Sequence, residues 1–342
     1  MTVTIRRPDD FHIHLRQGEA LASYAREAAA VFARAMVMPN TLPPVVSARD
    51  VLDYRRQILD ATEGSGFEPL MTFKLLPEIE AEEVGRMKEA GVIAGKLYPR
   101  GATTNAEDGA LRVEELFALI GAMEEAEVVL SIHGEDPDAF SLDREYAFLP
   151  AVERILEEFP RLRVVLEHIS DARSVAFVRE GPDRLAATIT VHHLYLSLDD
   201  VVGSFIMPHH FCKPIAKRPE DRGALVAAAL SGDPRFFLGT DSAPHPVGAK
   251  ECSEGCAGVY TAPVAMPLLA MLFERHGGAA WTRRLEDFTS RFGAQFYRLP
   301  LNGEALELRR EEWKVPERYG DVVPFRAGAE LSWQCSVPDR EG

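Results

Sequence analysis

Two histidines stand one residue apart near the amino terminus, in the stretch DFHIHLRQG. If this stretch is a strand, His12 and His14 point to the same side, with their Cα atoms roughly 7 Å apart. Both imidazoles could then bind one metal ion. Taken alone, the pair is more simply explained by histidines that are hydrogen-bonded to backbone carbonyls at a strand end.

Further residues of metal-binding type follow apolar runs in the same way. Lys96 follows VIAG, His133 follows LSI, His168 follows VVLE, and Asp241 follows FFLGT. Any one of them could simply mark the point where a strand leaves the core. A whole series of such side chains at the ends of apolar runs favours one shared site.

The apolar runs alternate with helical patterns, which predicts an α/β fold. We expect strands at 9–15, 33–39, 69–75, 92–98, 128–133, 163–168, 186–192 and 235–240. We expect helices at 19–30, 47–61, 78–90, 112–126, 150–159 and 219–231. The runs are nearly continuous rather than alternating, as in parallel strands that are covered on both faces.

Eight such units predict a (β/α)8 TIM barrel, in which all carboxyl ends of the strands meet on one face. A doubly wound open sheet is the alternative, but it would need a glycine-rich turn after the first strand, where this chain has HIHLRQG. We expect residues 1–342 to form a single barrel domain. The stretch from about 303 to 342, rich in proline, tryptophan and charge, is expected to be a short C-terminal appendage.

Composition excludes several classes of protein. The net charge of −15 argues against binding to nucleic acid. No apolar stretch approaches the length of a membrane span, and no basic segment followed by an apolar run suggests secretion, so we expect a cytoplasmic protein. The four cysteines are too few for a disulfide framework and form no C-x-x-C pair.

The ordered set of HxH, Lys, His, His and Asp resembles the amidohydrolase superfamily. Longer stretches resemble the single-function bacterial dihydroorotases, namely DDFHIHLR, VMPNTLPPV, GKLYPRGATTN, SIHGE, LEHIS, FCKPIAKRP, GTDSAPH and GCAGVYTAP. They extend from residue 9 to about residue 265. The resemblance implies reversible, zinc-dependent cyclisation of N-carbamoyl-L-aspartate to L-dihydroorotate and water in pyrimidine (UMP) biosynthesis. It also implies a homodimer.

The resemblance further implies two Zn²⁺ ions per subunit, bridged by a carboxylated Lys96 and a hydroxide. One ion would be held by His12, His14, Lys96 and Asp241, and the other by Lys96, His133 and His168. Asp241 would also act as general base and then as general acid. An unmodified Lys96 would instead be an ordinary strand-end lysine that pairs with an acid.

Substrate contacts are implied in the same way. Arg16, Asn40 and His245 would bind the α-carboxylate, and arginine suits a carboxylate because its fork donates two parallel hydrogen bonds. Ala257 would contact the substrate through its backbone. Without the resemblance, Arg16 would be taken for a surface residue and Asn40 for a turn residue.

The run 100–108 resembles a loop that closes over the substrate and contacts it through Thr103 and Thr104. Lys213 stands where relatives commonly carry an apolar residue whose backbone contacts the substrate. The remaining histidines fit no ligand position, and we interpret them as strand-end and loop residues; they are His192, His193, His209 and His210.

Two other functions stay open. The first is another cyclic amidase, of the hydantoinase or allantoinase type, whose members tend to have longer chains without the Arg16, Asn40 and His245 set. The second is an inactive barrel that serves as a scaffold, although such relatives typically lose metal ligands and every ligand position is filled here.

Overall fold

Eight parallel strands form the centre of the protein in the computed structural model, which describes residues 1–338. They are β2 (Asp9–Ile13), β3 (Arg34–Val37), β4 (Glu68–Lys74), β5 (Val92–Leu97), β6 (Val129–Ile132), β7 (Val164–Leu166), β8 (Leu185–Ile189) and β9 (Phe236–Leu238). Each strand pairs with the next one along the chain. All eight strands predicted from the sequence are therefore confirmed, and the open doubly wound alternative is excluded.

Backbone hydrogen bonds between β2 and the residues after β9 close the barrel. The amide of Asp241 donates to the carbonyl of His12 (2.8 Å), and the amide of His14 donates to the carbonyl of Ser242 (3.0 Å). The amide of Thr240 donates to the carboxylate of Asp10 (2.8 Å). The first and last barrel strands, each carrying metal-ligand candidates, are thus joined directly.

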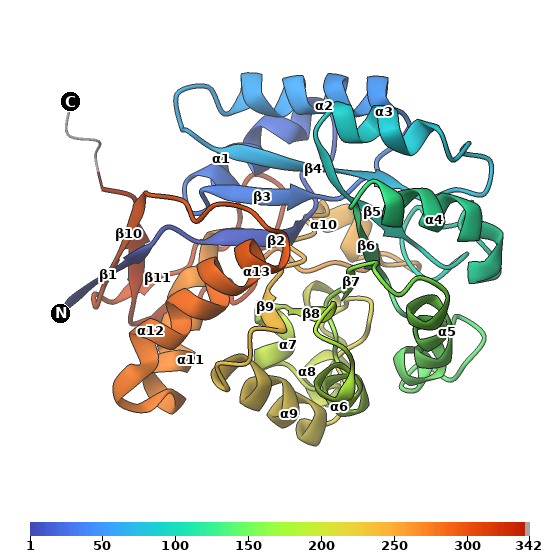
Figure 1. Ribbon diagram of the computed structural model, residues 1–342. Helices are drawn as coiled ribbons and strands as arrows, with labels where there is room; N and C mark the ends of the chain where they lie inside the picture. The colour runs from blue at the N-terminus through green and yellow to red at the C-terminus, as the bar shows by residue number, and fades with distance from the viewer. Residues whose placement is uncertain (339–342) are drawn as a thin grey trace.

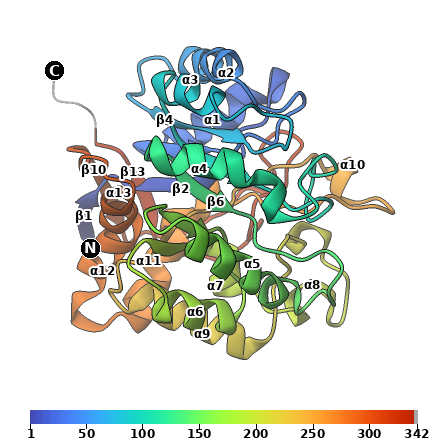
Figure 2. The same cartoon turned by 45° about the vertical axis from the view of Figure 1, so that its right-hand side comes forward.

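Helices surround the strands (Figures 1 and 2). They are α1 (Leu21–Ala29), α2 (Ala48–Ala61), α3 (Glu83–Glu89), α4 (Phe117–Glu125), α5 (Arg144–Glu158), α6 (Ala172–Glu180), α7 (Val191–Tyr195), α8 (Asp199–Val202), α9 (Pro219–Leu230), α10 (Val247–Lys250), α11 (Ala265–His276), α12 (Trp281–Glu286) and α13 (Phe292–Phe296). Helix α2 shows how they form: Ser47 and Asp50 make a capping box, and Val51, Tyr54 and Ile58 bury one face. Within residues 1–338, no helix has the length and apolar character needed to cross a bilayer.

The inside of the barrel contains one apolar side chain from every strand. They are Phe11, Met36, Leu70, Ala94, Val129, Val165, Ala186 and Phe237. On β2 the alternation breaks, because the register with β3 shifts between Asp10 and Ile13, and Ile13 packs with the outer core. A bulge of this kind re-aims neighbouring side chains, and here it directs His12 toward the mouth of the barrel.

A second, three-stranded antiparallel sheet lies beside the barrel, at the left of Figure 1. It joins β1 (Thr2–Arg6) to β10 (Ala305–Arg309) and β13 (Gln334–Ser336). A smaller pair consists of β11 (Trp313–Lys314) and β12 (Glu330–Leu331). The segment from about 303 therefore pairs with the amino-terminal strand β1, which the sequence analysis did not predict.

Every barrel strand ends slightly earlier than predicted, and the difference is largest at β8. The strand expected at 186–192 ends at Ile189, and His192 lies in α7 together with His193. The reason is local: the side chain of Thr190 accepts a hydrogen bond from the amide of His193 and caps a new helix.

Candidate active site

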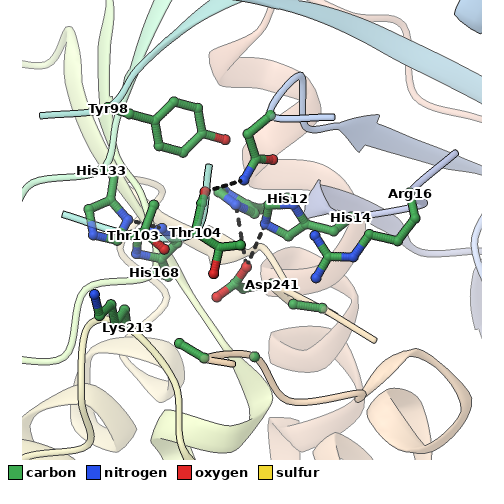
Figure 3. Close-up of a pocket in the computed structure, with 14 residues that line it drawn as sticks. His12, His14, Arg16, Tyr98, Thr103, Thr104, His133, His168, Lys213 and Asp241 are labelled. Atoms are coloured by element: carbon green, nitrogen blue, oxygen red, sulfur yellow. Dashed lines mark hydrogen bonds and ion pairs between the residues drawn. The ribbon is translucent and has the colours of Figure 1, made fainter. Parts of the chain in front are cut away.

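A narrow cavity lies at the carboxyl ends of the barrel strands, where Figure 3 shows it. All residues predicted for the site line it except Lys96 and His245. The lining comprises His12, His14, Arg16, Asn40, Tyr98, Thr103, Thr104, His133, His168, Lys213, Asp241, Ala243, Ala257 and Gly258. The barrel thus brings together residues that are far apart in the sequence.

On one side of the cavity, His12 and His14 face Asp241. The Nε2 atoms of His12 and His14 lie 3.5 and 3.1 Å from the same carboxylate oxygen, Oδ1 of Asp241. All three side chains have a donor atom within 4.8 Å of the others. The HxH pair and Asp241 therefore form a group that can hold one cation.

A second pair of imidazoles lies on the other side. The Nδ1 of His133 is 3.2 Å from the Nε2 of His168, and the ring of His168 is 4.8 Å from the ring of His12. Lys96 is completely buried, and its Nζ has no hydrogen-bond partner. This Nζ lies 4.6 Å from the centre of the Tyr98 ring.

Two buried carboxylates orient the histidines, and the sequence analysis missed both. Glu167 accepts a hydrogen bond from the Nδ1 of His12 (2.9 Å), and Glu135 accepts one from the Nε2 of His133 (2.8 Å). Each bond fixes the ring and leaves its other nitrogen directed at the cavity. The available signal was an acid inside or next to an apolar run, in VVLEH and SIHGE.

Burial favours the uncharged form of several basic groups of this site. It lowers the pKa of His14 to about 4 and that of Lys96 to about 7, and it lowers the pKa values of His133 and His168. Burial alone would raise the pKa of Asp241, but the hydrogen bond from His14 and the neighbouring imidazoles hold it below its usual value. His14, His133 and His168 are therefore uncharged and Asp241 is ionised, which are the forms that metal binding requires.

These residues fit a metal centre. Neutral imidazoles and a carboxylate are the ligands that Zn²⁺ takes in proteins. The Nζ of Lys96 and the Nδ1 of His168 are buried polar atoms without a partner, which is costly unless something binds there. An uncharged amine at Lys96 is also the form that can react with carbon dioxide.

Arg16 lies at the opposite end of the cavity from His133 in Figure 3. Its Nη2 donates to the Nε2 of His245 (2.9 Å), and its Nε donates to the carbonyl of Pro244 (3.1 Å). Burial and the charge of Arg16 lower the pKa of His245 to about 3, so this imidazole is neutral and accepts the hydrogen bond. Tyr54 donates to the carbonyl of Arg16 (2.6 Å) and fixes its backbone.

Asn40 connects the cavity wall to the loop 100–109. Its amide donates to the carbonyl of Thr104 (3.2 Å), and the side chain of Asn105 donates to its carbonyl (2.9 Å). Thr103 and Thr104 consequently reach the cavity. The loop predicted to close over the substrate therefore contacts the cavity wall in this structure.

Lys250 connects two further loops at the entrance of the cavity, which contain Phe211 and residues 256–258. Its buried ammonium donates to the carbonyls of Phe211 (3.0 Å), Cys256 (2.8 Å) and Gly258 (2.7 Å). The segments that carry Lys213 and Ala257 are thereby tied together. In Figure 3 the ammonium of Lys213 points toward the side of the cavity where His133 lies.

Tyr98 was not predicted from the sequence. Its ring lines the cavity, and its buried hydroxyl has no hydrogen-bond partner. Burial raises its pKa well above the usual value, so the hydroxyl keeps its proton and can donate to a ligand. The only signal was its place two residues after Lys96.

The remaining histidines lie outside the cavity lining. His192, His193 and Cys212 form a buried group close enough to share a cation. However, both ring nitrogens of His193 already have hydrogen-bond partners. Nε2 donates to the carbonyl of Pro214 (2.9 Å), and Nδ1 is hydrogen-bonded to the hydroxyl of Thr190 (2.9 Å). Burial raises the pKa of Cys212 to about 12, which keeps it a thiol, so this group is a poor metal site.

Comparisons with known proteins agree with this geometry. The family model described as amidohydrolase matches residues 10–195. A dihydroorotase of Teredinibacter turnerae is 45% identical over 97% of this chain and 98% of its own. Among solved structures, a dihydroorotase of Saccharomyces cerevisiae in complex with 5-fluoroorotic acid is 32% identical over 99% of both chains, with a TM-score of 0.92. A dihydroorotase of Campylobacter jejuni is 37% identical over 98% of this chain and 97% of its own, with a TM-score of 0.90.

Proposed function

The chain belongs to the amidohydrolase family and, within it, to the dihydroorotases, and from this premise we propose how its site works. It is a hydrolase of cyclic amide bonds that interconverts N-carbamoyl-L-aspartate and L-dihydroorotate in pyrimidine biosynthesis. The observation that carries the mechanism is the buried, unpartnered Nζ of Lys96 in a barrel whose mouth carries two groups of largely buried histidines.

We propose that two Zn²⁺ ions occupy these groups. His12, His14 and Asp241 would hold one ion and His133 and His168 the other, with a carboxylated Lys96 shared between them. When bound, the two cations would supply Lewis acidity toward the ring carbonyl and a hydroxide nucleophile at neutral pH.

The chain's own residues supply the proton transfers. Asp241 is unprotonated, because the imidazoles beside it lower its pKa. In hydrolysis it accepts the proton of the attacking oxygen and passes it to the ring nitrogen as the C–N bond breaks. In the synthetic direction the same proton returns by the reverse path.

Binding of the substrate carboxylate is assigned to Arg16, His245 and Asn40. The guanidinium is aligned by His245 and Pro244, so little conformational freedom remains to be lost on binding. Ala257, Thr103, Thr104 and Lys213 complete the contacts from the facing loops. Arg16 and Lys213 bring positive charge to the mouth of an otherwise acidic protein.

Purified protein with a measured metal content tests the function. It should cyclise carbamoyl aspartate and hydrolyse dihydroorotate, and it should not act on an unsubstituted hydantoin, which lacks the carboxylate that Arg16 binds. Removal of the metal by a chelator should abolish both activities, and Zn²⁺ should restore them. Hydantoin as the better substrate would favour another cyclic amidase, and no turnover with a filled metal site would favour an inactive barrel.

Lys96→Ala should lose the paired metal site and nearly all activity, because the shared carbamate would be missing. A small added carboxylic acid should restore part of both. Lys96→Arg should also be inactive, since a guanidinium stays charged and takes up no carbon dioxide. Electron density beyond Nζ that bridges two metal peaks is the direct evidence, and a bare amine beside a filled, active site would contradict the mechanism.

Cytoplasmic location and assembly as a homodimer are part of the same proposal. They rest on the family resemblance, and light scattering coupled to gel filtration tests the second.

A further inference from the structure

Lys74 is a buried cation at the carboxyl end of β4 that the proposed mechanism does not use. Its ammonium donates to the carbonyl of Asn105 (2.7 Å) and forms an ion pair with Asp108. Both partners lie on the loop 100–109. The ammonium therefore binds this loop, although Lys74 itself belongs to the barrel.

The loop is attached at two points, at and directly after the residues that face the cavity, Thr103 and Thr104. Asn40 bonds to Thr104 and Asn105 from the end of β3, while Lys74 bonds to Asn105 and Asp108 from the end of β4. Asn105 takes part in both attachments, and its backbone has φ 56°, a left-handed conformation that needs support from its surroundings in a residue other than glycine.

The two side chains of the ion pair differ in their exposure to solvent. The side chain of Lys74 is 2% exposed, whereas that of Asp108 is 46% exposed. If the loop moved away, the ammonium of Lys74 would lose both its carboxylate and the carbonyl of Asn105. Asp108 is already in contact with water. The attachment of the loop at this point therefore depends on the ammonium of Lys74.

We propose that Lys74 is a positioning residue for the reaction, acting with Asp108 as a latch that holds Thr103 and Thr104 against the substrate. The latch rests on the proposed function only in that the ligand is the dihydroorotase substrate. It makes no contact with the reacting atoms and contributes no charge to them directly.

Lys74→Met and Asp108→Asn should have the same effect, since each removes one half of the latch. We expect kcat/KM for both substrates to fall roughly tenfold or more, with the larger part in KM, while the metal content stays unchanged. The double variant should be no worse than the more affected single variant, because both act through one pair. Glu107→Gln is the matched control, since it removes the same charge from the neighbouring position of the loop, outside the ion pair.

Asp108→Asn separates the latch from simple attraction of an anionic substrate. A role in attraction predicts a lower KM for this variant, because the charge of Lys74 would no longer be neutralised. A latch predicts a higher KM. An unchanged or lower KM in Asp108→Asn would overturn the proposal, and this variant remains informative if Lys74→Met fails to fold.

Limited trypsin digestion tests the latch without substrate or turnover. Arg100 is exposed at the start of the loop, so loosening should accelerate cleavage there in both latch variants, with an unchanged melting temperature. Equal cleavage rates in wild type and variants would contradict the latch even if the wild type is active. The wild type could also be inactive while cleavage at Arg100 is still faster in both latch variants. That result would support the latch and contradict the proposed function.

Discussion

Three residues of the site have left-handed backbones although none is glycine. They are Arg16 (φ 59°), His168 (φ 42°) and Asp241 (φ 45°). Such conformations cost on the order of 1 kcal/mol or more each and persist only where the surroundings enforce them. Here hydrogen bonds stabilise these conformations. Tyr54 donates to the carbonyl of Arg16, and the amide of His168 donates to the hydroxyl of Thr188 (2.6 Å). The strain turns these side chains into the cavity just beyond the strand ends.

Asp241→Asn should retain most of the bound metal and lose most turnover in both directions. The amide keeps one oxygen for coordination but cannot accept and return the proton. Metal content by mass spectrometry and initial rates with both substrates measure the two effects separately. Near-normal turnover would remove Asp241 from the proton-transfer role.

Arg16→Met should weaken the binding of both substrates and leave the metal site intact. A lost hydrogen bond to a charged partner costs on the order of 1.5–3 kcal/mol, or roughly tenfold or more in affinity. The Michaelis constants for both substrates should therefore rise, while the metal content stays at the wild-type level. An unchanged Michaelis constant together with lost metal would show that Arg16 belongs to the metal site instead.

At the scale of the elements, the barrel strands are predictable because parallel strands covered on both faces give continuous apolar runs. The proposed metal ligands can be located in the same way, since each lies within three residues of the end of a strand. Other features depend on partners that are distant in the sequence, so the sequence does not predict them. β1 pairs with β10 from the far end of the chain, and Glu167 bonds to His12 across 155 positions.

Helix α5 begins at Arg144 rather than at 150. The helix continues through Pro150, and Phe148 and Val152 pack in the core on either side of it.

Gly293→Ala tests how α13 supports the floor beneath the site. A Cβ at Gly293 would lie 2.2 Å from a ring carbon of Phe11, which stacks on Tyr297 at 5.1 Å. The ring would have to move, so we expect a loss of roughly 1–3 kcal/mol in the free energy of unfolding. Because Phe11 precedes His12, metal affinity should fall as well.

Gly223→Ala is the control for this substitution. Gly223 is exposed in α9 and has no atom within 4 Å of the added Cβ. Alanine in a helix interior should there stabilise the protein by roughly 0.5–1 kcal/mol. Urea unfolding compares the two variants, and equal stability would show that the interior around Phe11 is loosely packed.

At the scale of the whole molecule, buried neutral histidines make the metal-free protein sensitive to acid. Burial lowers the pKa of His193 to about 4, whereas the unfolded chain has a value near 6.5. Below about pH 6.5 the unfolded chain binds a proton that the folded protein does not accept until about pH 4. The free energy of unfolding should therefore fall across this window, by up to roughly 3 kcal/mol for this residue.

Urea unfolding of the metal-free protein at about pH 7 and about pH 5 measures this effect. His193→Gln should reduce the difference between the two conditions, whatever it does to stability at neutral pH. His276→Gln is the matched control, because His276 is exposed on the surface. An unaltered difference in His193→Gln would mean that His193 is already charged in the folded protein.

Closure of the barrel between β2 and the segment after β9 has a consequence for folding during synthesis on the ribosome. The bond from Thr240 to Asp10 joins positions 230 residues apart. At a synthesis rate of about 5–20 residues per second, the strand with the two histidines waits about 10–50 s for its neighbour to leave the ribosome. Throughout that interval His12 and His14 have no Asp241 opposite them. The group of His12, His14 and Asp241 that can hold a cation is thus complete only in chains whose translation has passed the last strand of the barrel.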